Sequence, residues 1–220
     1  MILGFIFAHL NAVALGVWMI FLGMVLMRFL RPSLIGNISY SNLIFGAVAL
    51  HLCYAVFLTW GQYHLWATAS DFTRSLLMAP LPSEVPIPAV LEFLRPYLSG
   101  TLGYFSYYAF GRFFFNIITL FVVAGVLYGV LKLWNSYKKN FEAEDLEIFL
   151  ILMLIAGWPG IMVLVPLGFV AAVLFLVGST VFFKQNKISL IPVFLFTTPV
   201  VLIGGKAILD FLSLYSVLKI

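Results

Sequence analysis

Long apolar runs separated by short polar stretches dominate this chain. A helix needs about 20 mainly apolar residues to cross the hydrocarbon core of a bilayer. Three runs meet this length and each predicts a transmembrane helix; they cover about Phe5–Met27, Leu43–Trp60 and Tyr104–Leu131.

The run from Leu146 to Phe183 contains no positive charge and is too long for one span but short for two. It predicts a helical hairpin. Gly157-Trp158-Pro159-Gly160 is the favoured tip because glycine and proline favour turns, and Val165–Gly168 is an alternative. With the first tip, the leading arm is short enough to be re-entrant.

A last apolar run extends from Ile188 to about Ile203 and is interrupted by Pro199 and by the Gly204-Gly205 pair. Its continuation, residues 206–220, has polar residues near helical spacing among leucines and phenylalanines. This amphipathic pattern is typical of a segment that lies in the membrane interface.

The segment 67–100 is the longest connection and contains five of the ten prolines. Ser70 predicts the cap of a short helix that ends before Pro80, and Pro88 predicts the start of a second through Leu94. Connections beyond about 12 to 15 residues are usually functional or disordered. The many apolar residues here favour an ordered segment.

Composition sets the class of protein. Of the 220 residues, 64% are hydrophobic and 9% are charged, whereas soluble domains have roughly 25% charged residues. We therefore predict an all-α, polytopic transmembrane bundle of about five or six spans, formed by residues 1–220 as a single membrane domain. A soluble enzyme or a nucleic-acid-binding domain is excluded, because each needs polar surface that this chain lacks.

The basic residues predict the orientation. They fall on one side of the predicted spans, and this side is expected to be cytoplasmic: Arg28, Arg31, Lys132, Lys138, Lys139, Lys184 and Lys187. The N-terminus, the segment 67–100 and the C-terminus are then outside, in a membrane of the bacterial cytoplasmic (inner) type.

Ionisable residues within spans are candidate functional residues because they are costly at membrane depth. Tyr108, Arg112, Asn116 and Thr119 share one face of a regular helix. This polar stripe could line a path or bind an anionic lipid headgroup. In the alternative interpretation, Arg112 extends to the outer interface beside the tyrosines.

Histidines are the only candidate ligands of a haem or a metal. His9 lies about two turns into the first run and His51 near the middle of the second. Two antiparallel helices could present both to one haem b or one copper ion. The simpler interpretation is hydrogen bonding between helices, and no cofactor is predicted by any sequence motif.

The second short helix of the segment 67–100 is the candidate docking site for a partner protein. Leu91, Leu94 and Leu98 share one face, and Glu92 and Arg95 flank it. The same apolar side chains could instead lie on the membrane surface or on the ends of neighbouring helices.

Three functions remain open. Because no catalytic or nucleotide-binding motif is present, the first is a non-catalytic subunit of a secretion, transport or respiratory complex that binds lipid and protein partners, but no nucleotide or nucleic acid. The second is a small transporter or channel component that uses the polar stripe. The third is a small b-type cytochrome or a copper-handling protein that uses His9 and His51.

Overall fold

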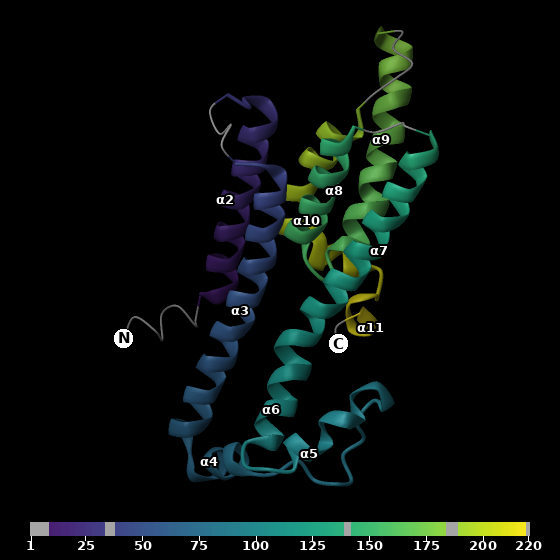
Figure 1. Ribbon diagram of the computed structural model, residues 1–220. Coiled ribbons are helices and arrows are strands. Elements are labelled where there is room, and N and C mark those ends of the chain that lie inside the picture. The colour runs from purple at the N-terminus through teal and green to yellow at the C-terminus, as the bar shows by residue number, and fades with distance from the viewer. Residues whose placement is uncertain (1–8, 34–37, 139–141, 184–188, 219–220) are drawn as a thin grey trace. The chain divides into compact units, whose positions relative to one another are not determined.

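The computed structural model describes residues 9–33, 38–138, 142–183 and 189–218, and all its regular elements are helical. Five of its helices are long and apolar enough to cross a membrane (Figure 1). This confirms the all-helical prediction. The five are α2 (Leu10–Leu30), α3 (Tyr40–Ala69), the continuous helix Gly103–Lys138, α9 (Ile161–Phe183) and α10 (Leu190–Phe211).

Two of these helices are longer than the sequence predicts. Helix α3 continues nine residues past Trp60 to Ala69, and the helix that begins at Gly103 continues to Lys138. No proline interrupts either extension. With 30 residues, α3 is about 45 Å long and exceeds a hydrocarbon core of about 30 Å.

The described chain forms two compact parts. Of the described residues, the bundle part contains 9–33, 38–48, 119–138, 142–183 and 189–218, and the loop part contains 49–118. Helix α3 and the helix 103–138 each continue from one part into the other. The candidate docking residues all belong to the loop part.

Helix α8 (Ala143–Ala156) is the most deeply buried helix of the bundle part, and it contacts α2, α9 and α10 (Figure 1). Its 14 residues span about 21 Å, which is too short to cross a bilayer. The chain reverses at Gly157, whose φ of 66° favours glycine, and α9 begins at Ile161. The predicted hairpin and its first tip are confirmed. The alternative tip is wrong, because Pro166 lies within α9.

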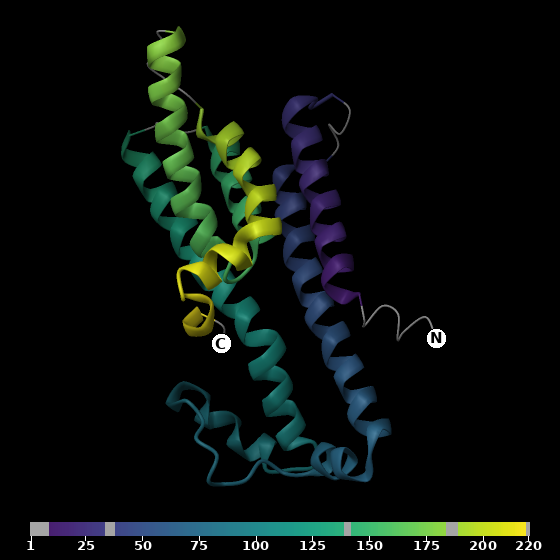
Figure 2. The same ribbon diagram turned by 180° about the vertical axis from the view of Figure 1, so that it is seen from behind.

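Helix α10 continues past Pro199 and Gly204-Gly205 to Phe211, so the predicted end near Ile203 is wrong. Packing against α8 and α9 holds the helix together across the proline. The chain then turns at Ser213 into α11 (Tyr215–Leu218), as Figure 2 shows. Trp158 at the hairpin tip donates its indole N–H to the carbonyl oxygen of Leu218 at 2.9 Å.

The loop part contains three short helices between α3 and Gly103. Ser70 caps α4 (Asp71–Met78) by accepting the Thr73 N–H at 3.1 Å, as predicted. A 3₁₀ helix, η1 (Ala89–Leu94), follows Pro88 and leads directly into α5 (Arg95–Leu98). Helix α6 (Gly103–Ala109) then begins the long helix, and a π-helical turn, η2 (Phe110–Phe114), joins it to α7 (Phe115–Lys138).

Candidate functional site

Hydrogen bonds hold the connecting segment (residues 70–102) together and attach it to the helix ends. The Leu81 N–H donates to the Leu98 carbonyl oxygen at 2.9 Å, and the Tyr104 N–H donates to Ala79 at 3.1 Å. Arg74 donates from Nε and Nη2 to the Ala67 carbonyl oxygen at 3.2 and 3.1 Å. These bonds give the connecting segment a defined conformation.

Arg95 holds the proline-rich half of this segment. Its guanidinium group donates to the carbonyl oxygens of Ser83 at 3.1 Å and Val85 at 3.2 Å, and it forms a salt bridge with Glu92. Tyr107 on α6 donates its hydroxyl to the Pro86 carbonyl oxygen at 3.1 Å. The structure therefore gives Arg95 a role in ordering the connecting segment, beside its predicted role in docking.

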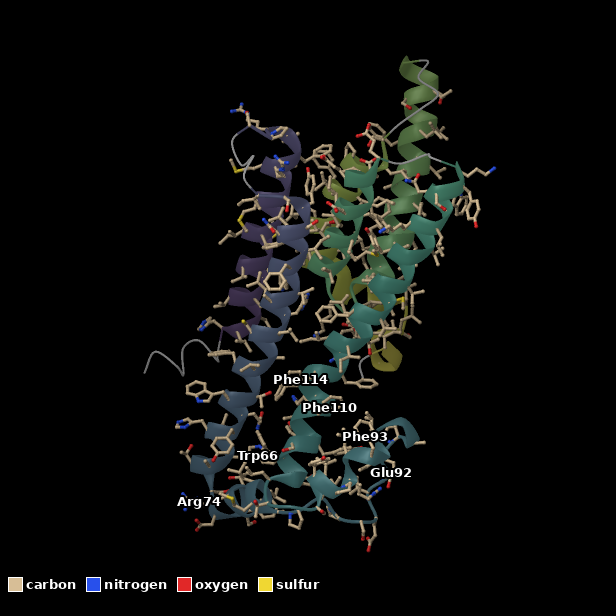
Figure 3. All side chains as sticks on the ribbon, in the orientation of Figure 1. Trp66, Arg74, Glu92, Phe93, Phe110 and Phe114 are labelled. Carbon is tan, nitrogen blue, oxygen red and sulfur yellow. The ribbon has the colours of Figure 1, made fainter. Side chains whose placement is uncertain are left out.

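An aromatic cluster joins the end of α3 to α6. The ring of Trp66 lies 5.4 Å from Phe105, 6.2 Å from Tyr104 and 5.0 Å from Tyr108, and Figure 3 shows it between the two helices. Leu77 of α4 is fully buried against the same cluster. Aromatic pairs at these distances are each worth about 0.5–1.5 kcal/mol beyond their burial, so this cluster supports the connecting segment.

The three predicted docking leucines share one face, as the sequence indicates. Leu91, Leu94 and Leu98 line a groove of about 190 Å³ together with Tyr107 and Phe110 of the long helix. The leucine face is thus turned toward the chain's own helix, and the groove lies between η1–α5 and α6–η2.

The short helices of the connecting segment also carry exposed aromatic residues, and one of them, Tyr97, lines the same groove as the leucines. Phe93 is 69% exposed and Tyr97 is 80% exposed, and Phe72 on α4 is 71% exposed. Phe93 is labelled in Figure 3 beside Glu92. These residues are not among the predicted docking residues, although the four-residue spacing of Phe93 and Tyr97 is a signal that could have found them. We call Phe93 and Tyr97 the aromatic surface.

The polar stripe is interrupted by the π-helical turn. Arg112 lies within η2, and its guanidinium carbon is 5.7 Å from the centre of the Tyr108 ring. Asn116 follows in α7, where its side-chain oxygen is buried with no hydrogen-bond partner. Thr119 begins the portion of α7 that belongs to the bundle part. π-Helical turns occur frequently at functional sites, so the stripe remains a candidate polar path or headgroup site.

His9 and His51 belong to different compact parts of the chain. His9 directly precedes α2, which begins at Leu10, while His51 is buried within α3. The predicted start of the first span at Phe5 lies outside the described residues. Among the described residues, no group of three or more histidine, cysteine or acidic side chains could hold a metal ion. The haem or copper hypothesis for His9 and His51 stays a prediction.

These observations define the class of protein. The five long apolar helices make the chain a multi-pass membrane protein whose helices suit contact with a lipid bilayer. Comparisons with protein-family models, curated proteins and solved structures found no match.

Proposed function

We propose that this protein is a non-catalytic membrane subunit of a larger secretion, transport or respiratory assembly, and that the connecting segment docks its partner. The observation that carries the proposal is the aromatic surface. Phe93 and Tyr97 are exposed on a segment whose conformation is held by its own hydrogen bonds and by the Trp66 cluster.

Physical arguments favour a protein partner for this surface. Exposed apolar area costs about 25 cal/mol per Å², and aromatic residues are enriched at the centres of protein interfaces. Because the connecting segment is already ordered, less conformational entropy is lost on binding. Glu92, which precedes Phe93, and Arg95, two residues after it, are suited to a polar rim around the contact.

Co-purification tests the docking proposal. The tagged full-length chain is purified in mild detergent as the wild type, as the Phe93→Ser/Tyr97→Ser variant and as Tyr137→Ser. We expect a reproducible set of partner proteins with the wild type, and at least a tenfold loss of them with the double variant, because two central aromatic contacts together are worth more than about 1.4 kcal/mol.

Tyr137 is the matched control because it is equally exposed but lies at the far end of α7. The Tyr137→Ser variant should retain the full set of partners. If the double variant also retains all of them at wild-type yield, docking through the aromatic surface is wrong.

We further propose that the connecting segment lies outside the cytoplasmic membrane and that the basic ends of the helices face the cytoplasm. A cysteine at Ser83 or Ser99 should react with a membrane-impermeant thiol reagent in intact cells, in a background with Cys53 replaced by serine. A cysteine at Ser136 should react only after permeabilisation. Labelling at Ser136 with protection at Ser83 would reverse the orientation.

One observation favours a second candidate, a small transporter or channel component with a path along Tyr108, Arg112 and Asn116. A buried amide oxygen without a partner costs about 1–3 kcal/mol, and the oxygen of Asn116 is in this state. A polar solute or an ion passing Asn116 would supply the missing bond. This candidate would be favoured over the subunit if the reconstituted protein alone transports a polar solute or an ion and the Asn116→Leu variant does not.

A further inference from the structure

The bundle part contains an apolar cavity of about 190 Å³ among α7, α8, α9 and α10. Its inner walls are the buried residues Leu146 and Phe149 of α8 and Phe194 of α10, and its outer wall includes Trp134 of α7 and Phe169 of α9. Asp145 supplies the one charged side chain in the lining.

The inner wall is closely packed. Phe194 is 1% exposed, and its ring makes edge contacts with Phe149 at 4.8 Å and with Phe169 at 5.6 Å. Gly168 permits this arrangement, because a β-carbon at this position would lie 2.3 Å from the Phe194 ring. The rings are therefore fixed, and the cavity is part of the packed structure.

The cavity is continuous with the apolar surface that faces lipid. Trp134 is 59% exposed, and Phe169 begins an exposed apolar face of α9 that continues through Val173 and Leu174. Both residues line the cavity and also belong to helices that are long and apolar enough to cross a membrane. An apolar cavity does not hold ordered water. In a bilayer, a hydrocarbon chain of a lipid is therefore the molecule that fills it.

The position of the cavity along the helices fixes which part of a lipid it meets. Leu190 is the first residue of α10, Asp145 lies in the first turn of α8, and Trp134 lies in the last turns of α7. The cavity therefore lies at the ends of three helices, where tryptophan commonly marks the headgroup level. The part of an acyl chain next to the glycerol backbone belongs at this depth.

We propose that this cavity binds one acyl chain of a bilayer phospholipid whose headgroup carries an ammonium group, such as phosphatidylethanolamine. The chain fills the space between Phe169 and Phe194, and the ammonium group lies beside the Asp145 carboxylate. A net anionic headgroup is disfavoured because the three carboxylates Glu142, Glu144 and Asp145 outnumber Lys132 and Lys138, the two described lysines in the last turns of α7. The inference is independent of the partner that the connecting segment binds.

Native mass spectrometry of the protein in mild detergent tests this site. Added phosphatidylethanolamine should give a one-lipid complex at lower lipid concentration than added phosphatidylglycerol. Leu190→Trp fills the cavity from a half-buried position and should abolish this complex. Leu174→Trp places the same side chain on the lipid-facing side of α9, outside the cavity, and should leave the complex intact.

The Asp145→Asn variant tests the headgroup. It keeps an oxygen for the Glu142 N–H, which Asp145 accepts at 3.2 Å, but it removes the charge. The preference for phosphatidylethanolamine over phosphatidylglycerol should fall about two- to fivefold, as expected for a partly exposed charge pair. An unchanged preference would overturn the assignment of the ammonium group to Asp145.

Cross-linking of the wild type provides a second measurement that needs no variant to fold. A phosphatidylethanolamine with a photoreactive diazirine near the carboxyl end of one acyl chain should label peptides containing Leu146–Phe149 or Leu190–Phe194. Equal one-lipid binding by wild type and Leu190→Trp, or labelling confined to the outer face of α9, would show that only surrounding bilayer lipid binds and would overturn the proposal.

Discussion

Replacing Gly103 by alanine is expected to disrupt the loop part. A β-carbon at Gly103 would lie 1.7 Å from the Leu98 carbonyl oxygen and 3.0 Å from the Leu81 nitrogen. These two atoms belong to the hydrogen bond that attaches the connecting segment to itself. Because backbone atoms cannot move aside as a flexible side chain can, the substitution should cost more than about 3 kcal/mol.

Limited proteolysis of the purified protein measures this effect. The Gly103→Ala variant should be cleaved within residues 79–100 under conditions in which the wild type resists cleavage, since exposed and unstable segments are preferred by proteases. Gly111→Ala is the matched control, because a β-carbon at Gly111 meets nothing within 4 Å. Equal resistance of Gly103→Ala and the control would contradict the described attachment.

Replacing Phe194 by alanine is expected to destabilise the bundle part strongly. Phe194 is fully buried and contacts the rings of Phe149 and Phe169. Removing such a ring from a packed interior costs about 3–5 kcal/mol through lost contacts and the cavity left behind. Dispersion contacts hold membrane helices together, so a large loss of stability is expected for this membrane bundle as well.

Phe196 is the control for this variant, because it lies on the same helix but is 77% exposed on the apolar surface. Thermal unfolding in the same detergent compares the two substitutions. Phe194→Ala should lower the midpoint clearly, whereas Phe196→Ala should leave it nearly unchanged. A similar midpoint for both variants would show that α10 does not pack as described.

Features with local signals were predictable from the sequence. Apolar runs indicate the spans, Ser70 and Thr73 form the N-terminal cap of α4, and Gly157 supplies the positive φ at the hairpin tip. Each feature depends on residues close together in the chain. The sequence therefore predicts their location well, although the helix ends differ by several residues.

Features that depend on distant packing were not predictable in the same way. Pro199 indicated a break, yet α8 and α9 hold α10 together across it. The π-helical turn at Arg112 has no sequence signal in this chain. The sequence places Leu91, Leu94 and Leu98 on one face, but only the groove that they share with Tyr107 and Phe110 shows that this face is turned toward the chain's own helix.

The central claim is that the aromatic surface binds a protein partner, and site-specific photocross-linking in intact cells tests it most directly. A photoreactive phenylalanine analogue replaces Phe93, Leu91 or Phe196, one at a time. The probe at Phe93 should form a discrete adduct with a second protein. The probes at Leu91 and Phe196 should form no such adduct, because Leu91 lies in the internal groove and Phe196 lies on the apolar surface. Lipid adducts alone from Phe93 would show that the aromatic surface lies on the membrane and would contradict the docking proposal.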